Sequence, residues 1–365
     1  MLKAAETGCA VVRPPRNPTQ EPTMTFVLDT RKTGTLPSTA QPFTNRLMTG
    51  TSDKSVLVRT DIDAAVDPVS RATPASIVAS HEYSDLEVRI AEEDRAFWCF
   101  MKPCERPSFT LPLLRDLAHM QSVIDELFAA TPRGAAAPFD YFVLGSRSQG
   151  VFNLGGDLNL FAAKIRAGDR EGLRRYAHAC VHSGYANYTG YGHGVVTIAL
   201  IQGDALGGGL EAPLSCDIMV AERQAKFGLP EVLFNLFPGM GAYSFLSRRI
   251  GAAKAEEMIL SGRLYTAAEM HALGVVDVLA EPGEGERAVR EYIARNRPRL
   301  RAQSAVYKIR RRVNPVPLQE LLDVTDLWVD TALGLSEQDL RRMSRIAAAQ
   351  QRAIGTGFAA RSAAH

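Results

Sequence analysis

The stretch that decides the fold spans residues 195–211, Val-Val-Thr-Ile-Ala-Leu-Ile-Gln-Gly-Asp-Ala-Leu-Gly-Gly-Gly-Leu-Glu. It begins with an unbroken apolar run, which is typical of a strand that is buried on both faces. Gly203 ends that run, and the three glycines at 207–209 form a turn that leads into a helix. A strand, a glycine turn and a helix start together expose unpaired backbone N–H groups, which can stabilise an anion.

The same order of signals occurs earlier in the chain. Phe139–Leu144 is a short apolar run between Pro138 and Gly145, and the turn Asn153–Asp157 precedes a helical segment. Two such turns that face one another could hold one oxyanion between a pair of N–H donors. The alternative is that the glycines only permit tight turns. Nucleotide phosphate binding is disfavoured, because neither turn is GxGxxG and neither continues into GK[ST].

The rest of the chain alternates between strand and helix patterns, which predicts an α/β fold with one main domain and a helical C-terminal part. Residues 1–78 lack any period and predict a disordered or loosely attached extension. We expect the core over residues 79–285 and the C-terminal helices over 286–355. Further strands are predicted at 86–90, 96–101 and 275–279, and helices at 111–128, 169–188, 252–273, 318–333 and 337–353.

Composition excludes several classes of protein. The chain has 365 residues, 46% of them hydrophobic, and 42 basic residues nearly balance 40 acidic ones, so no overall field favours nucleic acid or an anionic membrane. No run approaches 18 apolar residues, which excludes an ordinary membrane span. Five cysteines without a CxxC motif indicate a reducing compartment. The N-terminus has no apolar signal-peptide region, and we therefore expect a cytoplasmic location.

Two glutamates stand out beside the glycine turns. Glu211 lies in the first turn of the helix after the second turn, where it could simply complement the helix dipole. Glu231 follows a glycine and a proline within an apolar setting, and burial there would raise its pKa toward a value useful for acid–base chemistry. The alternative for Glu231 is an ordinary glutamate at the start of a helix.

Other candidates carry weaker signals. His178 and His182 share a helix face and could ligate zinc, but no third ligand stands near them in the sequence. No GxSxG motif supports a serine hydrolase. The basic stretch 295–312 is either a solvated face or a surface for a phosphate-bearing ligand or an acidic partner.

The combination of these motifs resembles the crotonase (enoyl-CoA hydratase/isomerase) superfamily over residues 83–280. The resemblance rests on Asn153–Asp157, Gly203–Glu211, Phe227–Glu231 and Phe237–Gly241. It implies a spiral of ββα units, usually assembled as trimers or hexamers. It also implies that Gly156 and Gly208 form an oxyanion hole, and that Glu211 and Glu231 are the two acid–base residues.

Within that superfamily the chain looks most like the diffusible signal factor synthases, which make cis-2-unsaturated fatty-acid signals for quorum sensing. The likeness rests on FWCFMKP at 97–103, GDALGGGLEA at 203–212, the block at 227–251 and DLWVDTALGLSEQDLRRM at 326–343. It implies that Leu206, Met240 and Trp328 line an acyl pocket.

The implied reaction is the dehydration of a 3-hydroxyacyl thioester on acyl carrier protein, followed by hydrolysis to a free cis-2-unsaturated fatty acid. The resemblance implies no metal and no redox cofactor, and a sensor kinase is a further implied partner. Two alternatives remain open: an ordinary enoyl-CoA hydratase acting on CoA thioesters, and a non-catalytic crotonase-like subunit that binds a partner.

Overall fold

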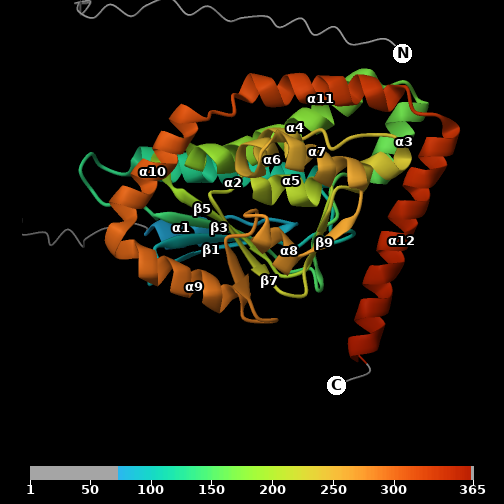
Figure 1. Cartoon of the computed structure of the whole chain (residues 1–365). Helices are drawn as coiled ribbons and strands as arrows, with labels where there is room; N and C mark the ends of the chain where they lie inside the picture. The colour runs from blue at the N-terminus through green and yellow to red at the C-terminus, as the bar shows by residue number, and fades with distance from the viewer. Residues whose placement is uncertain (1–72, 363–365) are drawn as a thin grey trace, which may run out of the picture. The chain divides into compact units, whose positions relative to one another are not determined.

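A computed structural model of the chain describes residues 73–362, with side chains up to residue 350 (Figure 1). The predicted N-terminal extension therefore lies outside the described residues, except for its last part. There, α1 (Pro74–Ala79) is a helix capped by the Thr73 side chain, and its Val78 is buried. The core thus begins a few residues earlier than the sequence pattern indicated.

The main sheet has six strands in the order β1-β2-β3-β5-β7-β10. β1 and β2 form an antiparallel pair and the other neighbours are parallel. This confirms the predicted α/β class and the strand pair at its edge. The strands are β1 (Leu86–Ala91), β2 (Ala96–Met101), β3 (Tyr141–Ser146), β5 (Val196–Ile201), β7 (Ile218–Glu222) and β10 (Val278–Ala280).

A second, smaller sheet contains the short strands β4 (Val151–Asn153), β6 (Asp204–Leu206), β8 (Lys226–Gly228) and β9 (Leu264–Thr266). Each of β4, β6 and β8 follows a strand of the main sheet and precedes a helical segment. This repeat of long strand, short strand and helix is the predicted succession of ββα units. Because β4, β6 and β8 pair in parallel, the segments that follow them lie side by side at the same edge of the smaller sheet.

Helices cover both faces of the main sheet, as the alternation of side chains along β2 shows. Phe97, Cys99 and Met101 point into the core under α2 (Leu111–Ala130) and α4 (Arg170–Thr189). Trp98 and Phe100 point into a second core closed by α9 (Gly285–Asn296). A strand buried on both sides has no polar face, which explains the continuous apolar runs in the sequence.

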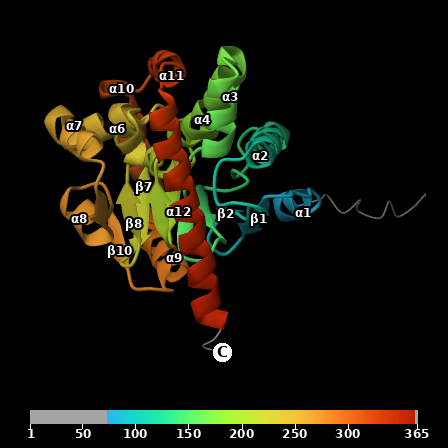
Figure 2. The same cartoon turned by 90° about the vertical axis from the view of Figure 1, so that its right-hand side faces the viewer.

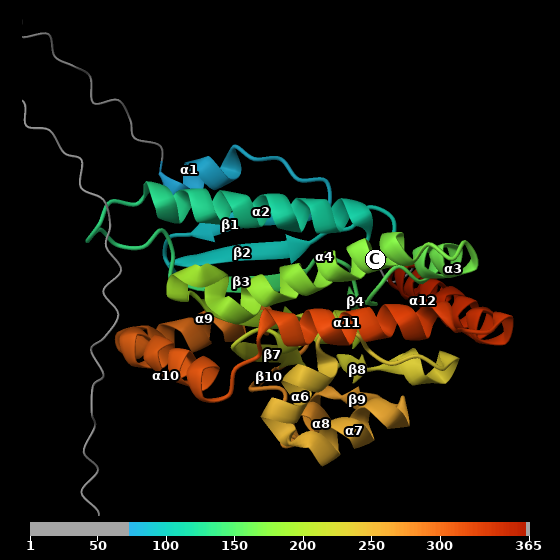
Figure 3. The same ribbon diagram turned by 90° about the horizontal axis from the view of Figure 1, so that it is seen from above.

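The remaining helices flank these layers (Figures 1 and 3). Seen from above, α2, α4 and α11 (Leu318–Leu333) lie side by side. The long α12 (Glu337–Ser362) contacts α3 (Leu158–Arg166) and the 3₁₀ turn η2 (Pro230–Phe234), and it crosses the front in Figure 2. The others are a π-turn η1 (Gly190–Gly194), α5 (Gly208–Leu214), α6 (Ala242–Ile250), α7 (Ala252–Ser261), α8 (Ala267–Ala272), η3 (Arg297–Arg299) and α10 (Leu300–Val313).

Three local expectations need correction. The helical stretch predicted at 252–273 is divided into α7 and α8 by the short strand β9. The helix predicted after the second glycine turn is short, because α5 ends at Leu214 and residues 218–222 form β7, which lies between β5 and β10 in the main sheet. The predicted strand at 275–279 begins only at Val278. No helix among residues 73–362 has both the length and the apolar character needed to cross a bilayer.

Candidate active site

The two glycine turns meet because β4 and β6 are paired neighbours. A Cβ built on Gly155, which has φ +88°, would lie 2.8 Å from the Gly208 nitrogen. A Cβ on Gly209 would lie only 1.9 Å from the Asn153 carbonyl oxygen. Contacts this short between backbones leave no room for side chains, so the glycines are required for close approach as well as for turning. The predicted juxtaposition of the two turns is therefore present.

Two peptide N–H groups remain free where the turns meet. The Asn153 side chain accepts a bond from the Gly155 amide at 2.7 Å, and the Tyr176 hydroxyl accepts one from the Asp157 amide at 3.1 Å. Within residues 73–362, the amides of Gly156 and Gly208 donate to no backbone or side-chain acceptor. A Cβ on Gly208 would lie 3.5 Å from the Gly156 nitrogen, so the two amides are close neighbours. Such a pair can hold an oxyanion.

Glu211 is fixed in place by the backbone of another segment. Its side chain comes from the first turn of α5 and is 3% exposed. Its Oε1 atom accepts hydrogen bonds from the Met240 amide at 2.7 Å and the Ala242 amide at 3.0 Å, at the start of α6. These two amide donors are contributions that sequence patterns did not reveal. The only signal for them is the Pro-Gly-Met-Gly run that precedes α6.

Glu231 has a different setting on η2. Its Oε1 atom lies 2.5 Å from the position that a Cβ on Gly207 would take, so the carboxyl abuts the second glycine turn. Its Oε2 atom is buried and has no hydrogen-bond partner among the described residues. A buried carboxyl oxygen without a partner in the free protein is available to a ligand that provides one.

Burial raises the pKa of both carboxyl groups well above the ordinary glutamate value. For Glu231 the negative charge of Glu211 raises the pKa further, whereas the two amide donors partly offset the rise at Glu211. Two neighbouring carboxyls with raised pKa values tend to share one proton between them. Raised pKa values suit both carboxyls to exchanging protons with a ligand near neutral pH.

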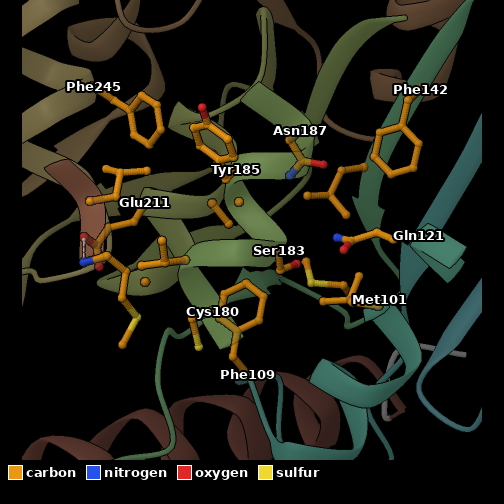
Figure 4. A pocket seen from close by; sticks show the side chains of 18 of the residues that line it. Met101, Phe109, Gln121, Phe142, Cys180, Ser183, Tyr185, Asn187, Glu211 and Phe245 are labelled. Carbon is orange, nitrogen blue, oxygen red and sulfur yellow. Dashed lines mark hydrogen bonds between the residues drawn. The ribbon is translucent and has the colours of Figure 1, made fainter. Parts of the chain in front are cut away.

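A cavity extends from Glu211 between α2, α4 and the main sheet (Figure 4). Gly208 and Met240 line it, so Met240 is the one residue of the expected acyl pocket that lies at this cavity. Leu206 and Trp328 are not part of its lining. Trp328 is 2% exposed, and its ring contacts Phe161 edge-on with centroids 5.0 Å apart. A Cβ on Gly239 would lie 2.3 Å from the Trp328 ring, so this indole packs beneath the segment that holds Glu211.

The other candidate residues have structural partners. The His178 Nε2 atom lies 2.7 Å from the Asp326 Oδ1 atom, which joins α4 to α11. No group of three or more potential metal ligands occurs in the part of the chain that the structure describes. Arg310 and Arg311 both bind Asp217, which is 2% exposed. Two arginines of the basic stretch are therefore paired with this buried carboxylate.

Comparisons with known proteins identify the family of the chain. The model of the family described as enoyl-CoA hydratase/isomerase matches residues 121–314, just over half of the chain. A probable enoyl-CoA hydratase, echA8, of Mycobacterium bovis is 49% identical over 80 residues, 22% of this chain and 31% of the relative. The mitochondrial methylglutaconyl-CoA hydratase of Rattus norvegicus is 47% identical over 98 residues, 27% of this chain and 31% of the relative. The matches thus span about a third of the length of these curated relatives.

Solved structures show the same fold. The enoyl-CoA hydratase from Bacillus halodurans superposes with a TM-score of 0.61 at 23% identity, over 72% of this chain and all of the other. DspI of Pseudomonas aeruginosa superposes with a TM-score of 0.52 at 25% identity, over 64% of this chain and 89% of the other. The expected crotonase fold is thereby confirmed. The motifs and the fold of this chain, together with the family match, place it in the enoyl-CoA hydratase/isomerase family of the crotonase superfamily.

Proposed function

We propose that the protein removes water from a 3-hydroxyacyl thioester, or adds it back across the C2–C3 double bond. The observation that carries this proposal is the arrangement of two buried carboxyls, Glu211 and Glu231, beside the free amides of Gly156 and Gly208. Burial of two neighbouring carboxyls disfavours their charged forms and costs free energy, so a non-catalytic protein would gain no stability from them. Elimination of water needs both a proton acceptor and a proton donor.

In the dehydration direction, the thioester oxygen lies between the Gly156 and Gly208 amides. One carboxylate takes a proton from C2, and the resulting enolate places its negative charge on that oxygen, where the two N–H donors stabilise it. The electron pair then forms the C2–C3 double bond while the C3–O bond breaks. The carboxylic acid of the pair gives its proton to the departing hydroxyl, which leaves as water.

The finer proposal is that the same site then releases a free cis-2-unsaturated acid, as in the diffusible signal factor synthases. A water molecule, deprotonated by a glutamate, attacks the thioester carbonyl; the carbon–sulfur bond breaks and the thiol takes up the proton. The tetrahedral oxyanion occupies the same pair of amides. The sequence blocks at 97–103, 203–212, 227–251 and 326–343 support this proposal. We further propose acyl carrier protein as the carrier, a sensor kinase as partner, and assembly as a trimer or hexamer.

The second candidate function is that of an ordinary enoyl-CoA hydratase, in which the product stays bound as a thioester. The curated relatives favour it, since they are named as hydratases of CoA thioesters. The two candidates share the dehydration step and differ only in whether the carbon–sulfur bond is broken.

Product analysis on the purified full chain tests both the proposed dehydration and the proposed release of a free acid. We would supply a 3-hydroxyacyl group on acyl carrier protein and on CoA, and follow 2-enoyl thioester, free acid and free thiol by mass spectrometry. Free cis-2-unsaturated acid supports the synthase, and accumulation of 2-enoyl thioester supports the hydratase.

Glu211→Gln and Glu231→Gln are the matched controls, because they preserve shape and remove acid–base capacity. The wild-type protein could show a normal thermal transition, and thus be folded, and yet convert neither substrate. The remaining function would then be that of a non-catalytic subunit that binds a partner.

A further inference from the structure

The cavity that begins at Glu211 runs along one face of α4. Tyr176 on that helix binds the Asp157 amide next to Gly156, and Cys180, Ser183 and Asn187 follow it at successive turns along the cavity. In Figure 4, Glu211 lies on one side of the cavity and Gln121 and Phe142 lie on the opposite side. With a rise of 1.5 Å per helical residue, Cys180 and Asn187 are separated by about 10 Å along α4. An acyl chain that starts at the paired amides would extend in this direction.

The wall of the cavity changes character along its length. Met101, Leu117, Phe142 and Leu144 give it an apolar lining, as a hydrocarbon chain requires. The far side also carries three neutral polar side chains, Gln121 on α2 and Ser183 and Asn187 on α4. Glu211 is the only charged residue of the lining.

The hydrogen-bonding capacity of these three side chains is largely unused. The Asn187 Oδ1 atom accepts a bond from the Tyr191 hydroxyl at 2.9 Å. Within residues 73–350, the Asn187 amide nitrogen and the side chains of Gln121 and Ser183 bind no other protein group. Polar groups next to a cavity normally find a protein, water or ligand partner.

The backbone next to the cavity is strained. Tyr191 has φ +56°, a left-handed conformation that is costly for a bulky side chain, within the π-turn η1. The strained backbone brings the Tyr191 hydroxyl onto Asn187 inside the cavity. Strain of this kind persists only where the surrounding structure enforces it, and it concentrates at functional sites.

We propose that Gln121, Ser183 and Asn187 form a distal polar subsite, which selects an acyl chain bearing a neutral hydrogen-bonding group, such as a hydroxyl, near the end remote from the thioester. This inference rests on the proposed function. A plain alkyl end would displace water and leave the three side chains unpaired, which costs binding free energy. A carboxylate end would be buried without a cationic partner.

The free space inside the cavity is small with the side chains as they stand. It is about 30 Å³, room for one or two water molecules. A chain therefore enters by displacing that water and by moving flexible side chains, of which Met101, Gln121 and Met240 line the cavity.

Substrate competition on the purified full chain tests the subsite. The substrates are three 3-hydroxydecanoyl thioesters, one plain, one with an ω-hydroxyl and one with an ω-carboxyl group. We expect kcat/KM to be about tenfold higher for the ω-hydroxyl than for the plain chain, which is the effect of one well-formed hydrogen bond. The ω-carboxyl substrate ranks last. Equal values for the plain and ω-hydroxyl chains, or a preference for the plain chain, would overturn the inference.

Variants of the subsite then test which side chains cause the preference for the ω-hydroxyl substrate. Gln121→Leu and Ser183→Ala should each lower the ratio of kcat/KM for the ω-hydroxyl over the plain chain severalfold. The matched control is Ser122→Ala, since Ser122 is exposed on α2 and its hydroxyl binds the Ala118 carbonyl oxygen. A ratio that stays at the wild-type value in both subsite variants contradicts the assignment. The thermal transition of each variant shows that it is folded.

Two further measurements separate this inference from the proposed function. A 3-hydroxybutyryl thioester is too short to reach the far side, so its turnover tests the dehydration alone. If no thioester is converted, calorimetric binding of decanoic and 10-hydroxydecanoic acid still decides the inference. Tighter binding of the hydroxylated acid, lost in Gln121→Leu, supports the subsite, and equal or weaker binding refutes it.

Discussion

Glu211 and Glu231 have the same side chain and lie near the same glycine turn, but the fold treats them differently. Glu211 is 3% exposed and is held by the amides of Met240 and Ala242. Glu231 contacts Gly207 through one oxygen, and its other oxygen is buried without a partner. One carboxyl is anchored by the start of α6 and the other is left free for a ligand.

This difference shifts the pKa values of the two carboxyls unequally. Amide donors stabilise the charged form of a carboxyl and lower its pKa, whereas burial raises it. Burial raises the pKa of both groups, the two amides offset part of the rise at Glu211, and the Glu211 charge raises the pKa of Glu231 further. The amides of residues 240 and 242 and the charge of Glu211 itself therefore both contribute to the difference between the two carboxyls.

The largest effect should come from removing either carboxyl. Glu211→Gln and Glu231→Gln should each lower the turnover of a 3-hydroxyacyl thioester by about 10²–10⁴, the usual cost of losing a general acid or base. Single-turnover kinetics would measure it, with circular dichroism to show that the variants are folded. Near-normal turnover in either variant contradicts the proposed dehydration.

Trp328→Ala tests how the segment that holds Glu211 is supported. The indole packs on Gly239 and Phe161, and the neighbouring Thr325 hydroxyl binds the Gly239 carbonyl oxygen at 2.8 Å, just before the amides that hold Glu211. Truncation should cost about 3–5 kcal/mol of unfolding free energy through the cavity it leaves. Denaturant unfolding measures this, with Leu327→Ala as control because Leu327 is 60% exposed.

A change of chain-length preference in Trp328→Ala, with little loss of stability, would instead support the prediction that Trp328 lines the acyl pocket. Rates on C8, C12 and C16 substrates distinguish the two results.

Gly209→Ala moves α5, which carries Glu211, away from the first glycine turn. The added Cβ would meet the Asn153 carbonyl oxygen at 1.9 Å, and overpacking of this kind typically costs about 1–3 kcal/mol. We expect a lower melting temperature together with slower turnover. Gly334→Ala is the matched control, since its Cβ would lie at ordinary contact distances, 3.4 Å from the Thr331 carbonyl oxygen and 4.0 Å from that of Asp330. A Gly209→Ala protein with wild-type stability would show that the two turns can separate without cost.

A further effect concerns stability and pH. The pKa of Glu231 is raised by folding, so its contribution to stability is complete below the unfolded-state pKa and is lost as pH rises through the folded-state pKa. Glu231→Gln should therefore stabilise the protein relative to wild type at high pH and not at pH 4. The gain is about 1.4 kcal/mol for each pKa unit of the shift.

Melting temperatures measured from pH 4 to pH 9 check this expectation. The same substitution at Glu126, which is exposed on α2, serves as control. A difference between wild type and Glu231→Gln that does not grow with pH would show that Glu231 is not a buried acid.

Local patterns predicted most of the elements because each depends on nearby residues. The apolar spacing over residues 111–128 predicted α2, and the continuous run at 195–201 predicted β5, since periodicity reflects burial directly. β7 was missed because Ile218–Glu222 follows α5 after three residues, and its strand character arises from pairing with β5 and β10. Strand formation depends on partners distant in sequence.

The sequence by itself determined the glycine turns, the positions of both glutamates and the family to which the chain belongs. All of these depend on residue types at fixed short spacings, which survive in the linear pattern. Tertiary structure alone decided that amides of residues 240 and 242 hold Glu211, that Arg311 neutralises the buried Asp217, and that Gln121 lies across a cavity from Glu211. Backbone donors carry no side-chain signature, and contacts between distant segments arise only when the sheets and helices pack.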